Sequence, residues 1–322
     1  MEKETFTFEQ ISELDNHTIM HYAAPVIIVA VLIEWLVGLY RKRNYYDSKD
    51  FTAALVIGGI NTLLSVGFKV LFFYITMAIY NMVPWAVPRS WWGFILCFIA
   101  VDFCRYWAHR ISHEQRFWWA THVTHHSSEK MNFSVSFRTG WTQQIKFIFF
   151  LPVPFLGIDP ITFFICHQIA VLYQFWVHTE LIGKLPAAIE YIFVTPSHHR
   201  VHHGSNALYI DKNYGSTSII WDRLFGTYQE EVERPVYGLT KPIGSYNPFY
   251  LVFHEWLDIW KDLKGASSLK DMFNLLFMPP GTLVTERQRK NEVLESIKTS
   301  PGYTVVEPAL EFDKREQLPQ GV

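Results

Sequence analysis

The chain has 322 residues, of which 49% are hydrophobic and 17% aromatic, while only 18% are charged. This composition is more apolar and more aromatic than that of an average soluble domain, which makes a membrane protein the leading class. The formal net charge of −2 excludes a general polyanion-binding surface, so nucleic acid is not expected as a partner.

Three apolar stretches in the first third of the chain have the length of membrane spans. Residues 22–40 match the roughly 20 residues that cross hydrocarbon as a helix, with Glu34 as the one charge inside. Residues 52–82 suit a tilted span, and residues 91–108 predict another before polarity returns at His109. Glu34 either faces the bundle interior and serves function, or lies near the interface and reaches water.

A fourth apolar segment, residues 143–178, is interrupted by Pro152, Pro154 and the turn-like string GIDP at 157–160. Proline inside a helix removes a backbone hydrogen bond and kinks or ends the helix. The segment is therefore expected to form a kinked helical hairpin that returns to the side of the membrane it left.

Basic residues set the expected orientation, because short loops rich in Lys and Arg stay in the cytoplasm. The loop after the first span carries Arg41, Lys42, Arg43 and Lys49. Counting spans from this loop delivers residues 109–142 and the chain after residue 178 to the same cytoplasmic face. The sequence thus predicts an all-α integral membrane protein with about four transmembrane or re-entrant helices and a cytoplasmic, histidine-rich helical cap.

We divide the chain accordingly into four parts. Residues 1–21 form an N-terminal tail, and residues 22–108 the transmembrane helices. Residues 109–260 form a histidine-box catalytic domain that includes the membrane hairpin, and residues 261–322 a cytoplasmic C-terminal tail.

Histidines are gathered in a few short motifs. His109 and His113 are four residues apart on the continuation of the third span, so both imidazoles lie on one helix face. The strings HVTHH at 122–126 and HRVHH at 199–203 each place imidazoles at positions i, i+3 and i+4. Nine of the 14 histidines fall within residues 109–126 and 198–203, which ordinary core or surface histidines do not explain.

The eight matched histidines overfill a single site, because one zinc ion takes about four ligands, and they therefore predict two metal ions. Imidazole suits Zn, Cu, Fe and Ni alike, so the ligands leave the metal open. His178, at the end of the last apolar helix, is a further ligand candidate, while His167 and His198 are left undecided.

The position of the motifs at the ends of membrane spans favours one chemistry, because a long apolar substrate can enter there from the bilayer. A dinuclear iron centre that activates O2 against a lipid C–H bond fits this position. Two alternatives from other classes stay open. A membrane zinc hydrolase would ordinarily add bridging carboxylates, and a metal-transport protein would carry polar residues along several spans.

Polar residues near the motifs are candidates for supporting roles. Asp102 shares a helix stripe with His109 and His113, so it either orients a ligand through a hydrogen bond or pairs with a nearby arginine. Four residues in or after the third motif are expected to brace it or to fold the cap: Arg200, Asp211, Asn213 and Asp222.

The strings HRISH, HVTHH and HRVHH, in this order after apolar spans, resemble the fatty acid hydroxylase and sterol desaturase superfamily of membrane di-iron oxygenases. The likeness covers roughly residues 90–230. The longer strings HRISHE, HHSSEKMNFS and DKNYGSTSIIWDRLFGTY are similar to the alkylglycerol monooxygenase branch.

The resemblance implies an integral membrane enzyme that binds two iron ions and uses O2 to hydroxylate a lipid, with Glu114 as a catalytic acidic residue. For the branch it implies cleavage of alkylglycerol ethers with tetrahydrobiopterin as reductant. The sequence has no pterin signature of its own, so another external electron donor stays open, as does the oligomeric state. Further C-terminal apolar spans expected in the animal enzymes do not follow the cap, which leaves a sterol or acyl-lipid hydroxylase or desaturase as an alternative. The implied iron ligands, with His178 added, are His109, His113, His122, His125, His126, His178, His199, His202 and His203.

Overall fold

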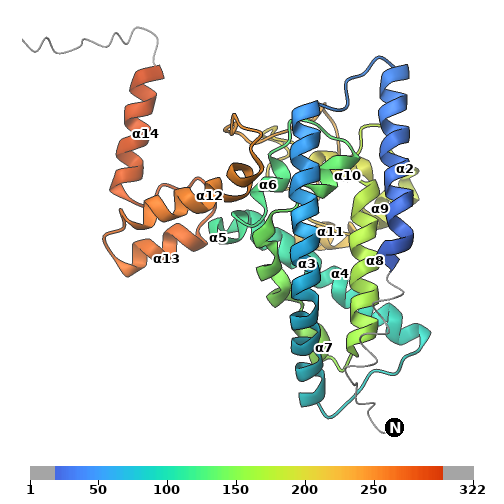
Figure 1. Cartoon of the computed structure of the whole chain (residues 1–322). Coiled ribbons are helices and arrows are strands. Elements are labelled where there is room, and N and C mark those ends of the chain that lie inside the picture. The colour runs from blue at the N-terminus through green and yellow to red at the C-terminus, as the bar shows by residue number, and fades with distance from the viewer. Residues whose placement is uncertain (1–18, 300–322) are drawn as a thin grey trace, which may run out of the picture.

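The computed structural model describes residues 19–299, and within that range the chain is helical and contains no β-strand (Figure 1). Three helices are long and apolar enough to cross a membrane: α2 (Ile19–Tyr40), α3 (Ser48–Met82) and α4 (Trp91–Glu114). They contain the three predicted spans. The expected tails lie partly outside the described residues, which include only 19–21 of the first tail and 261–299 of the last.

Side chains that accept hydrogen bonds from free backbone N–H groups fix where two of the long helices begin. Asp47 accepts from Lys49 and Asp50, each at 3.0 Å, so α3 begins at Ser48. Ser90 accepts from the backbone N–H of Gly93 at 3.3 Å and caps α4 in the same way.

The predicted hairpin is present, but its first arm differs from an ordinary α-helix. It runs as a 3-10 helix, η2 (Trp141–Phe150), then a short turn of helix, α7 (Pro152–Phe155), and returns as α8 (Pro160–Trp176). Prolines 152 and 154 prevent η2 from continuing. Asp159 accepts from the N–H groups of residues 161 and 162 at 3.1 Å and starts the return helix. At 17 residues α8 is shorter than the three long helices.

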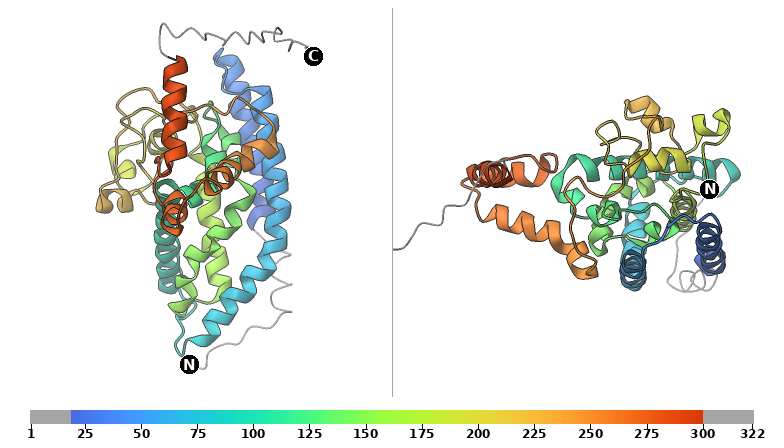
Figure 2. Two further views of the ribbon diagram at one scale, coloured as in Figure 1. Left: turned by 90° about the vertical axis from the view of Figure 1, so that its left-hand side faces the viewer. Right: turned by 90° about the horizontal axis from the view of Figure 1, so that it is seen from above.

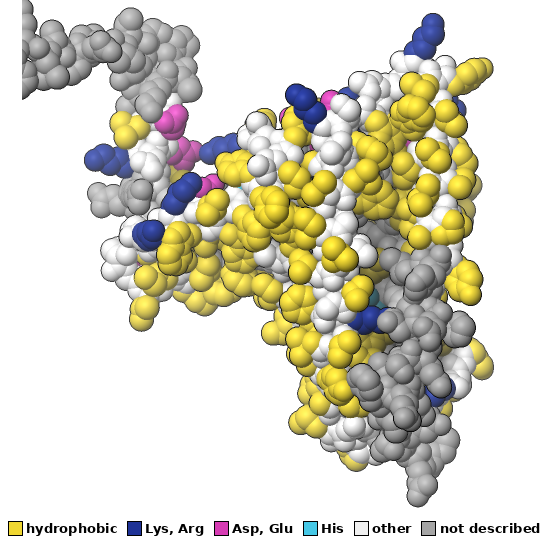
Figure 3. All heavy atoms as spheres, viewed as in Figure 1, with side chains coloured by type: hydrophobic (Ala, Val, Ile, Leu, Met, Phe, Trp, Pro, Cys, Tyr) yellow, Lys and Arg dark blue, Asp and Glu magenta, His cyan; other side chains and the backbone are white. Residues whose placement is uncertain are grey.

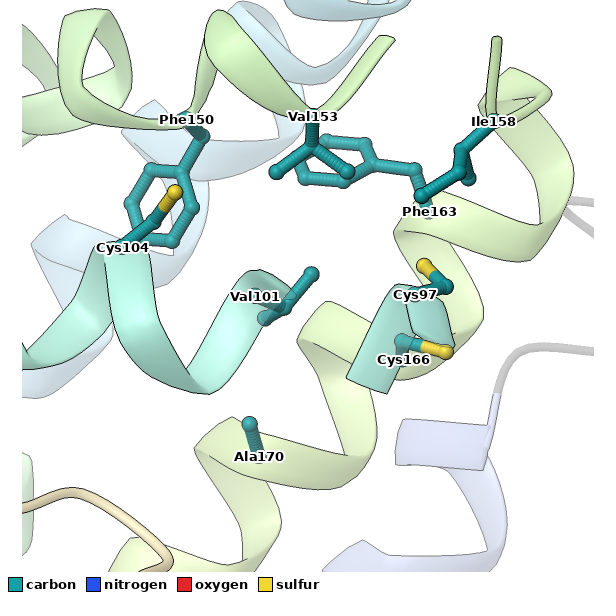
Figure 4. Packing of buried hydrophobic residues seen from close by; sticks show 9 residues of the cluster. All are labelled: Cys97, Val101, Cys104, Phe150, Val153, Ile158, Phe163, Cys166 and Ala170. Carbon is teal, nitrogen blue, oxygen red and sulfur yellow. The ribbon is translucent and has the colours of Figure 1, made fainter. Parts of the chain in front are cut away.

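A hydrophobic core joins α4 to both arms of the hairpin (Figure 4). Its fully buried members include Cys97 and Val101 of α4, Val153 of α7, and Phe163 and Cys166 of α8. Figure 4 shows Cys97 and Cys166 on neighbouring helices, and both thiols are free. In contrast, α2 and α3 expose most of their apolar side chains outward, as lipid-facing helices do.

Shorter helices form the remainder of the chain. Figure 1 shows α6 and α10 near the ends of α2 and α3 that the 41–47 loop connects. The view from above in Figure 2 shows α12 and α13 projecting away from the bundle. These elements are α5 (Arg116–Trp119), α6 (Val123–His126), η1 (Phe133–Phe137), α9 (Ala187–Ile192), α10 (Pro196–His202), α11 (Ile220–Phe225), α12 (Pro248–Leu263), α13 (Leu269–Phe277) and α14 (Glu286–Thr299).

Candidate metal centre

Local helix signals place the histidines of each motif. Helix α4 continues past the predicted end of its span to Glu114, so His109 and His113 project from one face of the same helix. Helix α6 is a single turn that carries His125 and His126. Helix α10 begins with Pro196 at its first position, where the missing N–H is not needed, and presents its histidines from the next turn.

The nine predicted ligand candidates come together in two groups, although they come from four separate segments of the chain. Within each group the nitrogen atoms that could bind a metal all lie within 4.8 Å of one another. The first group contains His109, His113, His122, His126 and His202, and the second contains His125, His178, His199 and His203. Among the described residues, neither group includes a carboxylate.

Backbone carbonyl groups fix which nitrogen of three imidazoles faces the centre. The Nδ1 atoms of His109, His178 and His202 lie 2.8, 2.7 and 3.0 Å from the carbonyl oxygens of residues 214, 174 and 212. A carbonyl oxygen can only accept, so each Nδ1 carries the proton and each Nε2 keeps a lone pair. This is the way in which outer partners orient imidazole ligands in metal sites.

The inward Nε2 atoms are crowded in a manner that fits a metal ion. Six pairs of these atoms within the groups are 2.8 to 3.2 Å apart. The Nε2 atoms of His109 and His113 are buried without a hydrogen-bond partner in the described structure. Two nitrogens bound about 2.1 Å from one metal are about 3.0 Å apart at a right angle and about 3.4 Å apart at a tetrahedral angle. Nitrogens at these separations can bind one metal ion together.

Burial keeps the imidazoles of the cap in the neutral form that binds metals. It lowers the pKa of each of these side chains well below the ordinary value, and for most of them the neighbouring imidazoles lower it further. The affected residues are His122, His125, His126, His199, His202 and His203.

The other predicted residues lie outside the two groups. Glu114 accepts from the Arg110 guanidinium at 2.7 Å, and its side chain is 42% exposed. His167 contacts the ring of Phe150, with ring centres 4.9 Å apart. His198 accepts the backbone N–H of residue 195 at 3.3 Å and so helps to cap α10.

Orienting a histidine was one of two roles left open for Asp102, and its hydrogen bonds go elsewhere. Its carboxylate accepts from the backbone N–H groups of Thr217 and Ser218, at 2.8 and 3.1 Å, and from the Trp221 indole at 2.9 Å. Seven residues of helix separate it from His109, a rise of about 10 Å, which is too far for direct contact. Asp102 instead fastens the segment between residues 214 and 222 to α4.

Asp222 is the strongest support of that segment. It accepts from the backbone N–H groups of Tyr214 and Gly215 and from the Thr227 hydroxyl, each at 2.7 Å. The carbonyl of the same Tyr214 holds His109, so Asp222 positions this candidate ligand through two links. A Cβ on Gly215 would lie 2.6 Å from a backbone carbonyl and 2.8 Å from this carboxylate, which is why glycine stands there.

The sequence left open whether Glu34 faces the bundle interior or the interface. It is buried and accepts from the backbone N–H of Phe133 at 2.8 Å and from the hydroxyls of Tyr46 and Thr179. Thr179 directly follows His178. The carboxylate thus faces the bundle interior and connects α2 to the second histidine group. No sequence signal other than an acidic residue inside an apolar run could have indicated this.

The fold and the site together define a helical membrane protein with two polyhistidine groups whose nitrogens are arranged as metal ligands would be. Residues 94–227 match the family model described as fatty acid hydroxylase. The match includes every histidine of both groups.

Several curated proteins are similar to the chain over most of its length. Alkylglycerol monooxygenase of Homo sapiens is 37% identical over 85% of this chain and 62% of that protein. The Xenopus tropicalis alkylglycerol monooxygenase is 35% identical over 85% of this chain and 61% of its own length. Ornithine lipid hydroxylase OlsE of Rhizobium tropici is 27% identical over 64% of this chain and 65% of its own. The chain spans about three-fifths of the alkylglycerol monooxygenases it matches. No solved structure matches it significantly.

Proposed function

We propose that the chain is a membrane di-iron oxygenase that hydroxylates a C–H bond of a lipid with O2. The observation that carries the proposal is the convergence of nine imidazole nitrogens into two groups at the ends of apolar helices. The fatty acid hydroxylase domain supports iron and O2 chemistry. The resemblance to alkylglycerol monooxygenases supports a lipid ether as substrate.

Two bound iron ions would supply the electron transfer to O2 and the oxidation of the lipid C–H bond. The protein's part is to hold the ions, to orient the imidazoles and to exclude water. Carbonyl oxygens at residues 174, 212 and 214 keep three imidazoles in the tautomer that binds metal. Burial prevents protonation of the ligands, which would release the ions.

Iron is favoured over zinc by the composition of the donor set. A pair of hydrolytic zinc ions would ordinarily share carboxylates, and both described groups consist of imidazole alone.

For an alkylglycerol the reaction inserts one oxygen atom of O2 into the C–H bond beside the ether oxygen. The second oxygen atom leaves as water, with two electrons and two protons from an external reductant. The product is a hemiacetal, which separates into a fatty aldehyde and glycerol. The proposed reductant is tetrahydrobiopterin or another external donor. Glu114, exposed beside the first histidine pair, is the proposed acidic residue of the reaction.

We place the centre at the cytoplasmic face of a multi-pass protein. Arg41, Lys42 and Arg43 follow the end of α2 that lies on the same side of the bundle as α6 and α10 (Figure 1). The catalytic domain proposed at 109–260 ends inside α12, which runs on to Leu263.

The test is to measure iron content and O2 consumption of the detergent-purified protein, reconstituted anaerobically with ferrous iron and given reduced pterin and an alkylglycerol. His202→Ala should lose iron and lipid-dependent O2 uptake. His254→Ala is the matched control, because His254 lies on α12 outside both groups. Two zinc ions without O2 uptake would refute the proposal. Uptake with acyl lipids or ornithine lipids, but not with alkylglycerols, would keep the oxygenase and change its substrate.

A further inference from the structure

Helices α12 and α13 carry an exposed apolar face that nothing in the described chain covers. On α12 the side chains of Phe253, Leu257 and Trp260 are spaced by four and three residues, and the last two are 48% and 60% exposed. On α13 the side chains of Leu269 and Phe273 are 84% and 62% exposed. Single exposed apolar residues are ordinary, but a continuous stripe on two adjacent helices indicates an interaction surface.

The polar residues of the two helices are segregated from this stripe. Lys261 pairs with Asp258 at 2.9 Å, and its side chain is 66% exposed. Lys270 on α13 is exposed as well. Lys264 extends over the Trp260 ring at 5.0 Å, the way a lysine reaches from an apolar surface toward water. Tryptophan and lysine side by side are typical of the membrane interface.

The orientation of the two helices fits a membrane surface. Figure 1 shows α12 and α13 lying across the direction of α2 and α3. Figure 3 shows Lys and Arg side chains along one edge of this projection, and apolar side chains along the edge that faces the far end of α3. A helix pair that lies on a bilayer presents its apolar side to the acyl chains in this way.

The packing of α12 against α3 places α12 at the depth of the membrane interface. Its Leu251 and Val252 pack against Ala53 and Ile57 in the first turns of α3. Helix α3 has 35 residues, about 52 Å at 1.5 Å per residue. The hydrocarbon core is about 30 Å thick, so α3 extends well beyond it. Helix α12 joins α3 close to the end that emerges.

From these observations we propose that α12 and α13 lie flat in the interface of the leaflet next to the metal centre, and that their apolar stripe is embedded among lipid acyl chains. The partner is the bilayer itself, because the stripe is bordered by charged residues and lies level with the emerging end of α3. The proposal depends on the chain being a membrane protein and not on the reaction that it catalyses.

Arg116 connects this surface to the histidine groups. Its guanidinium bonds to Glu255 and Asp262 of α12, each at 2.7 Å, and its backbone N–H donates to Met278 after α13 at 3.0 Å. Arg116 starts α5, the short helix between the first two histidine motifs. Membrane contact of α12 and α13 therefore sets the depth at which this part of the metal centre meets the lipid.

The test uses single cysteines labelled with an environment-sensitive fluorophore in the full chain, reconstituted in phosphatidylcholine nanodiscs. Phe273→Cys and Leu269→Cys report the stripe, and the exposed, charged Lys270→Cys, about 100° around the helix from Leu269, is the comparison position. The unsubstituted chain gives the background, because its three cysteines are buried. Quenching by spin-labelled lipid and by aqueous iodide is compared at each position. Leu269, which is the most exposed of these apolar side chains, serves if Phe273→Cys does not fold.

Severalfold stronger lipid quenching at positions 273 and 269 than at position 270, with the reverse order for iodide, is the expected result. Equal iodide quenching at all three positions would show that α13 lies in water and would overturn the proposal. Shielding of positions 273 and 269 from both quenchers would also overturn it, because a second copy or another protein would then cover the stripe. These readouts need no enzymatic turnover, so failure of the proposed reaction would leave them unaffected.

Discussion

Replacing Asp222 by alanine tests whether the metal centre depends on the segment that follows the third histidine motif. The carboxylate accepts three hydrogen bonds of 2.7 Å, two of them from the buried N–H groups of Tyr214 and Gly215. Each buried donor left without a partner costs about 1 to 3 kcal/mol. The Thr227 hydroxyl can still bond to Tyr106, 3.0 Å away. Asp222→Ala should therefore destabilise the fold by about 4 kcal/mol.

The substitution should also weaken metal binding, because the Tyr214 carbonyl holds the imidazole of His109 in place. Removing an outer partner of a metal ligand typically weakens metal binding about 10 to 100-fold. Thermal midpoints in detergent and anaerobic ferrous iron titrations measure the two effects. Asp258→Ala is the control, since Asp258 is half exposed and pairs only with Lys261 on the surface. An Asp222→Ala variant with unchanged iron affinity would refute the reasoning.

Three further predictions address the groups and their supports. Glu34→Gln should lower iron occupancy at the second group, because the amide N–H₂ would face the Phe133 N–H and the Thr179 hydroxyl, which donate to the carboxylate in the native chain. Iron content of the purified variant measures this effect. Full occupancy would contradict the role of Thr179. His113→Ala and His199→Ala should each leave about one iron ion of two. Mössbauer spectra should show this as a loss of spin coupling between the ions. Loss of both iron ions in each variant would show that the two groups are not separate sites. Burial raises the pKa of Asp222 to about 6, above its unfolded value of about 3.9, so the unfolded chain loses its proton first. Stability should therefore fall by about 3 kcal/mol as pH rises from about 4 to about 6, and Asp222→Asn should flatten this slope in melting scans; an unchanged slope would contradict the assignment.

The sequence predicted the parts of the site that depend on local geometry. The imidazoles at i and i+4 of each motif fall in the same group, as a shared helix face suggests, whereas the i+3 members His125 and His202 fall in the other group. The continuation of α4 beyond its span placed His109 and His113 as expected. Hydropathy likewise located α2, α3 and α4. The 3-10 form of η2 was not predictable, because it depends on tertiary contacts such as those of Gln144 with Asn61 and Ser65.

Long-range hydrogen bonds could not be predicted in the same way. Three candidate ligands are oriented by backbone carbonyls. Every residue type has such a carbonyl, so no residue in the sequence marks these contacts. Asp102 shows the reverse case, since a shared helix stripe suggested a histidine partner that lies about two helical turns away. Glu34 binds residues 99 and 145 positions away in the chain. Only the fold brings such partners together.

Three of the imidazoles are hydrogen-bonded to backbone carbonyls and not to carboxylates, and this affects the net charge of the site. Nine neutral imidazoles add no negative charge, so two divalent ions would bring four positive charges into a buried site. Asp211 is the one described carboxylate paired with a ligand, 3.6 Å from Nδ1 of His113, and its side chain is 54% exposed. Uncompensated buried charge is costly unless anions bind there. Two divalent ions held by these imidazoles alone would therefore keep a net positive charge, unlike a zinc pair neutralised by bridging carboxylates. Among the described residues, the all-imidazole donor set thus distinguishes the site from a carboxylate-bridged hydrolytic pair.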